Sequence, residues 1–153
     1  MDKKKLYIWA SDISPNSGEG ILCGKYIEFL KKNYQIRKIT HKSSNKKTLF
    51  HKYIEPFIGI YRLWGVYLRG YSTCYINYLP FWNFLIFLLL PPKTIIGPIT
   101  GGSVYEVNLS INSLIRKFIF PIMYFLSNII ITFRYKKVLF STSLLQKNVF
   151  KKL

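Results

Sequence analysis

The stretch Lys93–Ser103, KTIIGPITGGS, joins a short apolar strand to a glycine-rich loop. The pattern predicts a strand over Thr94–Gly97, which the loop Gly97–Ser103 ends. A comparable loop, Ser14–Gly20 (SPNSGEG), follows an apolar run near the N-terminus. Glycine tolerates positive φ and lets the backbone approach a ligand closely. Two such loops at the carboxyl ends of parallel strands would frame one crevice in an open α/β sheet, and we expect the functional site there.

The rest of the chain alternates between strand and helix patterns in the same way. Lys5–Ala10 is a continuous apolar run, as in a central parallel strand covered on both faces. Cys23, Ile27 and Leu30 recur at helical spacing and predict a helix from about Gly20 to Lys32. Further strands are predicted at 34–40, 73–79 and 138–140, and further helices at 50–68, 80–91, 112–129 and from 143. This order predicts an α/β fold with a doubly wound parallel sheet, one Rossmann-like domain over residues 1–153.

Two of the predicted helices carry long apolar stripes. The periodicity is the one that aromatic and aliphatic residues show when a helix packs on a core, so we expect both stripes to be core-facing. The stripes are Phe50, Tyr53, Ile54, Phe57, Ile60, Tyr61, Trp64 and Leu68 in the earlier helix, and Leu114, Phe118, Ile122, Phe125 and Ile129 in the later one.

The charge of the chain is strongly one-sided. Its 153 residues contain 23 Lys and Arg against 6 Asp and Glu, which gives a net charge of +17. Such a surplus favours an anionic partner: a membrane surface, a polyphosphate or a nucleic acid. The abundance of Lys, Asn, Ile, Tyr and Phe is also what an AT-rich genome produces, so compositional bias is an equal explanation of the charge.

No sequence signal indicates secretion or a membrane span. Residues 1–5 lead directly into a strand pattern and lack the features of a signal peptide. The most apolar segments, 79–90 and 118–133, are too short or too interrupted by Pro, Ser and Asn to cross a bilayer. Aromatic residues beside basic pairs do suit the interfacial zone of a membrane, although such pairs are equally typical of solvated helix ends. We therefore expect a cytoplasmic protein that can attach peripherally to the inner face of the cytoplasmic membrane.

Cysteine and histidine show no pattern of a metal or a catalytic triad. Cys23 and Cys74 are far apart and not part of a CxxC pair, so we expect them to be buried small apolar residues. His41 and His51 lie in or after a polar stretch and are expected at the surface. We expect no metal and no cofactor.

Gly18–Gly20 stands directly before the first predicted helix, where main-chain amides and the helix dipole favour a phosphate. Known phosphate-binding fingerprints do not fit. A Walker A loop fails because five residues instead of four separate Gly18 from Gly24, and Tyr26 stands where Ser or Thr is required. The dinucleotide pattern G-x-G-x-x-G fails because the third glycine comes one position late. A turn that simply starts a helix is the alternative.

Carboxylates for general-base catalysis are few. Asp12 and Glu19 lie on the first loop, and Glu106 follows the second. We predict Asp12 as the first candidate for the catalytic base, with loop or capping roles as the alternative for all three.

Four segments together resemble the N-terminal half of GT-B-fold glycosyltransferases of bacterial polysaccharide and lipopolysaccharide assembly. They are Lys5–Ala10, Ser14–Gly20, Ile96–Gly102 (IGPITGG) and Val138–Ser143. The resemblance implies transfer of a sugar from a nucleotide-sugar donor to a glycan or lipid-linked acceptor. It also implies that this half binds the acceptor and that a second half, predicted to be absent from this chain or supplied by a separate one, holds the donor. The chain by itself is then expected to be inactive.

The resemblance also implies which residues meet the donor phosphates and line the cleft between the two halves. Amide donors there would stabilise the negative charge that develops on the leaving nucleotide. The residues are Gly18, Glu19, Gly20, Gly97, Pro98, Thr100, Gly101, Gly102 and Ser103.

A second hypothesis rests on the charge alone. In this reading the chain is a non-catalytic basic module that binds an anionic membrane surface or nucleic acid. The basic residues are dispersed and form no recognised nucleic-acid motif, so no specific nucleic-acid partner is expected.

Overall fold

The computed structural model describes residues 3–39, 49–101 and 111–142. The strands are β1 (Lys4–Ala10), β2 (Tyr34–Lys38), β3 (Ser72–Pro80), β4 (Ile95–Thr100) and β5 (Val138–Phe140). The helices are α1 (Gly18–Lys31), α2 (Leu49–Tyr67), α3 (Phe84–Leu89) and α4 (Ile111–Arg134). The helix predicted from residue 143 lies outside the described residues.

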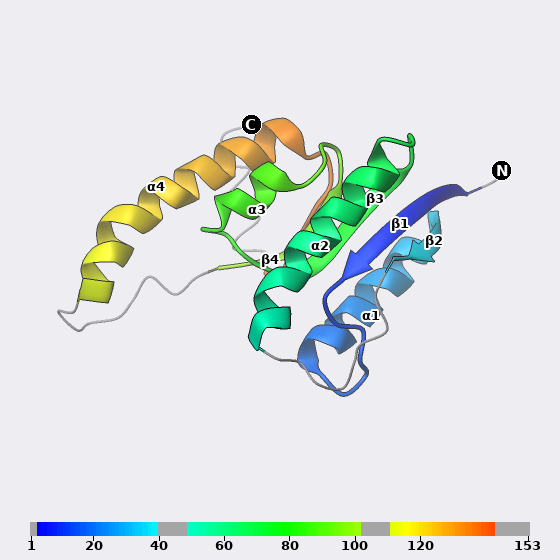
Figure 1. Ribbon diagram of the computed structural model, residues 1–153, viewed down its shortest axis with the longest axis horizontal. Helices are drawn as coiled ribbons and strands as arrows, with labels where there is room; N and C mark the ends of the chain where they lie inside the picture. The colour runs from blue at the N-terminus through cyan, green and yellow to red at the C-terminus, as the bar shows by residue number, and fades with distance from the viewer. Residues whose placement is uncertain (1–2, 40–48, 102–110, 143–153) are drawn as a thin grey trace.

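The strands form one parallel sheet in the order β2-β1-β3-β4-β5. The chain moves outward from β1 to β2 and then returns past β1 to β3. β1 and β3 therefore flank the topological switch point, which is where ligands of doubly wound domains bind. Helices lie on both sides of the sheet (Figure 1), and the predicted Rossmann-like α/β architecture is confirmed.

Each face of the sheet has its own hydrophobic core. Leu6 and Ile8 of β1 pack on one face with Cys23 and other side chains of α1. Trp9, which points the opposite way because strand side chains alternate, belongs to a core shared with α2, α3 and α4. Figure 1 shows these three helices grouped on one side, away from α1.

A close contact fixes α2 on its face of the sheet. A Cβ added to Gly59 would lie 2.3 Å from the indole ring of Trp9, so the glycine lets the helix lie directly on this ring. Trp9 in turn stacks on Tyr75 of β3, with ring centroids 4.8 Å apart. The helix and two central strands thus share one packed aromatic unit.

The fourth strand is longer than predicted. β4 continues to Thr100, so residues 97–99, predicted as a loop, are buried inside the sheet. Gly97 has a φ of 139°, and a Cβ there would lie 2.4 Å from the carbonyl oxygen of Leu139 in β5. The register of β4 shifts at this point against both β3 and β5. A strand tolerates proline, which has no N–H to donate, at such an irregularity. Glycine is therefore required at position 97 because β4 and β5 approach each other closely there.

Of the two apolar stripes predicted to face the core, the one in α4 is largely exposed and the one in α2 is only partly buried. In α4 the buried positions are Ser127 and Ile131, on the side opposite the stripe. In α2, Ile60 of the predicted stripe is buried and Trp64 packs against the core, whereas Phe57 and Tyr61 are exposed. Both helices are apolar on both sides, so periodicity alone does not identify the inward one. The exposed stripe residues are Phe57, Tyr61, Leu68, Phe118, Ile122, Phe125 and Ile129.

Candidate functional site

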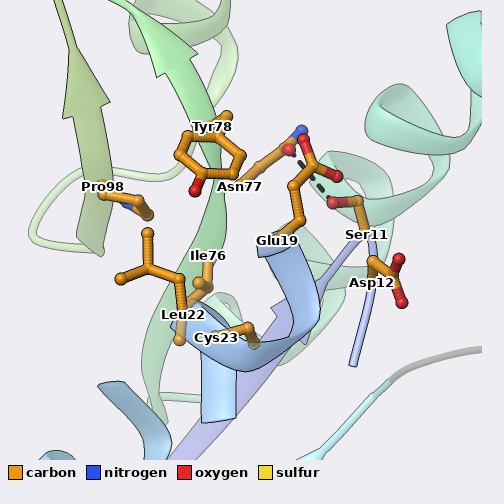
Figure 2. Close-up of a pocket in the computed structure, with 9 residues that line it drawn as sticks. All are labelled: Ser11, Asp12, Glu19, Leu22, Cys23, Ile76, Asn77, Tyr78 and Pro98. Atoms are coloured by element: carbon orange, nitrogen blue, oxygen red, sulfur yellow. Dashed lines mark hydrogen bonds between the residues drawn. The ribbon is translucent and has the colours of Figure 1, made fainter. Parts of the chain in front are cut away.

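A small cavity opens at the switch point, between the carboxyl ends of β1 and β3 and the first turns of α1 (Figure 2). Its volume of about 10 Å³ is roughly that needed for one water molecule. The side chains around it come from β1 and its following loop, α1, β3 and β4. They are Ser11, Asp12, Glu19, Leu22, Cys23, Ile76, Asn77, Tyr78 and Pro98.

Asp12 anchors the loop that joins β1 to α1. Its carboxylate accepts a hydrogen bond from the backbone N–H of Ser14 at 2.7 Å and another from the hydroxyl of Ser17 at 2.8 Å. The Ser17 hydroxyl accepts from the N–H of Gly20 at 2.9 Å, which makes Ser17 the N-cap of α1. Asp12 therefore fixes where the helix begins and how its first turn faces the cavity.

The two glycines of this loop have different roles. A Cβ on Gly20 would lie 1.9 Å from the carbonyl oxygen of Ser14, so a larger residue would displace the loop. A Cβ on Gly18 would meet no atom within 4 Å. The amides of Gly18 and Glu19 belong to the first helical turn, where N–H groups have no intrahelical acceptor. These amides are the donors available to a ligand at this end of α1.

Glu19 stands at the mouth of the cavity. Figure 2 shows its carboxyl group near the pair formed by Ser11 and Asn77, whose side chains are joined by a hydrogen bond of 3.0 Å. Glu19 is exposed, and no hydrogen bond or ion pair with another described residue involves its carboxylate. Its position in the first turn of α1 stabilises the negative charge through the helix dipole. The mouth thus combines one exposed carboxylate with neutral hydrogen-bonding groups.

The cysteine at the cavity is not a nucleophile at neutral pH. Burial raises the pKa of the Cys23 thiol to about 11. The charge of Lys38 lowers this pKa by a smaller amount, and the charge of Asp12 raises it slightly further. Burial also raises the pKa of Cys74, the third residue of β3. Both cysteines are free and buried, as the sequence predicted. The neutral thiol of Cys23 therefore serves as an apolar part of the cavity wall.

The remaining predicted cleft residues do not all meet here. Pro98 reaches the cavity, whereas Gly97 is buried beside β5. Thr100 is not among the lining residues: it pairs with Pro80, and its carbonyl accepts from the N–H of Phe81 at 2.9 Å. Gly101 is exposed directly after β4. Gly102, Ser103, Glu106 and His41 lie outside the described residues, and His51 falls within α2.

Sequence reasoning missed three polar residues that line the cavity. Ser11 follows β1 directly, and Asn77 and Tyr78 lie near the carboxyl end of β3. The signal that points to them is their place at the ends of two strands that turn out to flank the switch point. That signal becomes usable only when the strand order is known.

Comparisons with protein-family models, with curated proteins and with solved structures found no match. Within the part of the chain that the structure describes, no group of three or more His, Cys, Asp or Glu residues is placed to hold a metal ion. Among the helices of that part, none has the length and apolar character needed to cross a membrane.

Proposed function

We propose that this domain is the acceptor-side half of a GT-B-fold glycosyltransferase, which transfers a sugar from a nucleotide-sugar to a glycan or a lipid-linked acceptor. The observation that carries the proposal is the switch-point cavity, where Asp12 from the loop after β1 and Glu19 from the start of α1 meet Pro98 of β4. Ligands of doubly wound domains bind at this position, outside the carboxyl ends of the strands. The cavity is then the floor of a cleft whose other wall is a donor-binding domain.

In this proposal Glu19 is the carboxylate that contacts the acceptor hydroxyl. It accepts the hydroxyl proton as the acceptor oxygen bonds to the anomeric carbon and the nucleotide departs. The base role predicted for Asp12 suits Glu19 better, because Asp12 already accepts hydrogen bonds from Ser14 and Ser17. Asp12 acts through the loop as a positioning residue. A phosphate beside Glu19 is disfavoured, since two anions would share one helix end.

The donor phosphates would lie further out, where the second domain closes on this one. The exposed backbone at Gly101, directly after β4, suits that contact. A cavity of about 10 Å³ does not hold a sugar nucleotide, so the proposal requires a second half, in the same chain or a separate one. A lipid-linked acceptor would require peripheral attachment to the inner face of the cytoplasmic membrane.

Isothermal titration calorimetry tests the proposal. The chain joined to a donor-binding half is titrated with nucleotide-sugars, and transfer to glycan and lipid-linked acceptors is then followed. We expect donor binding and transfer, and we expect Glu19→Gln to reduce kcat at least a hundredfold with little change in donor affinity. An absence of both donor binding and transfer by the joined protein would contradict the proposal.

The alternative function, a non-catalytic basic module, is favoured by the net charge of +17. It predicts binding to plain double-stranded DNA with the steep salt dependence of counterion release, comparable to binding of anionic vesicles. Parallel salt titrations with DNA and vesicles separate it from a transferase half.

A further inference from the structure

The outward side of α4 is apolar along its described length. Phe118, Phe125 and Phe133 are 63%, 64% and 87% exposed, and they recur three to four residues apart with Ile122 and Ile129 between them. On the opposite side of α4, Ser127 and Ile131 are buried. A helix that is apolar all round requires an apolar environment on both sides. Water on the outer side leaves a large part of this surface unfavourably solvated.

The neighbouring helices extend this surface. α2 and α3 cover the same face of the sheet as α4, and the indole N–H of Trp64 in α2 donates to the carbonyl of Leu89 in α3 at 2.7 Å. We call the outward side chains of the three helices the apolar helix face. Its exposed members are Ile54, Phe57, Ile58, Tyr61 and Leu68 of α2 or its end, Leu85, Leu88 and Leu89 of α3, and Phe118, Ile119, Ile122, Phe125, Leu126, Ile129 and Phe133 of α4.

A hollow with basic residues at its rim lies at one end of this face. It has a volume of about 540 Å³, and Leu88, Ile129 and Phe133 contribute apolar walls from α3 and α4. Lys93 and Lys136 line the same hollow and are exposed. The hollow thus places ammonium groups directly beside exposed aliphatic and aromatic side chains, the arrangement found at a membrane interface.

The sequence that carries the three helices has a strong excess of basic residues. From the start of α2 at residue 49 to residue 153 the sequence contains two acidic residues, Glu55 and Glu106, whereas twelve Lys and Arg occur in the same range. We propose that the apolar helix face docks on an anionic lipid bilayer, inserting its apolar side chains among the acyl chains while the basic rim binds lipid phosphates. This inference names the surface for the membrane attachment included in the proposed function. Its vesicle test involves neither the switch-point cavity nor a sugar, so the two proposals can fail separately.

Charge also favours a lipid bilayer on this face over a second copy of the chain or a nucleic acid. A second copy of the chain would bring two surfaces of the same positive sign together, because each copy carries +17. Nucleic acid would need cations spread over the surface to neutralise phosphates, but the centre of the face is uncharged and rich in Leu and Ile. An anionic bilayer offers acyl chains to the apolar centre of the face and phosphates to its basic rim.

Co-sedimentation of the full chain with lipid vesicles tests this inference. We expect binding to vesicles of phosphatidylcholine with 30% phosphatidylglycerol, and at least tenfold weaker binding to pure phosphatidylcholine. The double variant Phe125→Gln/Phe133→Gln should weaken binding tenfold or more. Lys136→Gln should weaken it about fivefold at low salt. All these side chains are exposed, so circular dichroism melting curves should stay unchanged.

The other face of the sheet supplies matched controls. Phe29 and Lys25 lie on α1 and are exposed, and we expect Phe29→Gln and Lys25→Gln to bind vesicles within twofold of the unchanged chain. Equal loss in these controls would overturn the proposal, as would wild-type binding by the Phe125→Gln/Phe133→Gln variant. A dimer in analytical ultracentrifugation that this variant dissociates, without vesicle binding, would assign the face to a second copy instead. Tighter binding to DNA than to anionic vesicles would also overturn it.

Discussion

The two faces of the sheet are covered by helices of opposite character. α1 buries Cys23, Ile27 and Leu30 and exposes a mixture of acidic and basic side chains. The helices α2–α4 on the other face expose mainly apolar ones, and α4 has no acidic residue at all. Five of the six acidic residues occur by residue 55 of the sequence. The comparison separates a solvated layer, which carries the candidate site at its edge, from a layer whose outward side chains are mainly apolar.

The largest expected loss of stability comes from a substitution at Gly20, near the start of α1. Gly20→Ala forces a Cβ to within 1.9 Å of the carbonyl oxygen of Ser14, and backbone has little freedom to move away. We expect a loss of about 3 kcal/mol in the free energy of unfolding, measured by urea denaturation. Gly24→Ala is the control: its Cβ meets nothing within 4 Å, and alanine should stabilise α1 by about 0.5–1 kcal/mol. Equal effects of the two substitutions would contradict the packing described for this loop.

The corresponding test of the other layer is Gly59→Ala in α2. Its Cβ would lie 2.3 Å from the ring of Trp9, which is buried and stacked on Tyr75. Because a side chain yields more easily than backbone, we expect a smaller loss, about 1–3 kcal/mol. Gly65→Ala, also in α2 but with open space, should be neutral or stabilising. A stabilising Gly59→Ala would mean that α2 does not lie on Trp9 as described.

Asp12→Asn probes the loop without altering its volume. The substitution removes the charge from the hydrogen bonds to Ser14 and Ser17 and weakens the capping of α1. We expect a loss of about 1–2 kcal/mol in thermal or urea unfolding. Vesicle binding by the apolar helix face should stay the same, because the loop belongs to the other layer. Unchanged stability would show that Asp12 does not hold the loop.

The smallest expected effect is on the reactivity of Cys23, which lines the switch-point cavity. Burial raises the pKa of Cys23 to about 11, so its alkylation by iodoacetamide should be slow at pH 7 and should rise as the pH approaches 11. Because the folded pKa lies above the unfolded value of 9.0, this thiol stabilises the fold below pH 9 and loses that contribution as the pH rises towards 11. Mass spectrometry after timed labelling gives the rate. Rapid labelling of native protein at pH 7 would contradict the described burial.

The sequence predicted the fold well because its strands are short apolar runs separated by clear helical periodicity. It failed at Gly97 and Pro98, where the usual breaker residues lie inside β4. The reason for the glycine is the carbonyl of Leu139, a contact that is distant in sequence. It also failed on the apolar stripe of α4, because a helix with two apolar sides has the same periodicity whichever side faces inward.

The candidate site was predictable in part. Asp12 and Glu19 were found because they follow the first strand, where a doubly wound fold places its ligands. Asn77 was missed because one polar residue near the end of an apolar strand carries no signal until β3 is known to pair with β1. Asp12 differs from Glu19 because its carboxylate accepts hydrogen bonds from Ser14 and Ser17. The spacing of residues in the sequence does not reveal these bonds.

Amide NMR of the labelled chain, titrated with a panel of short oligosaccharides, tests most directly that the switch-point cavity is the acceptor site. We predict chemical-shift changes concentrated at Ser11, Glu19 and Asn77, with residues of α2–α4 unaffected. The panel would contradict the account if no oligosaccharide shifts these amides, or if the changes occur only on the apolar helix face.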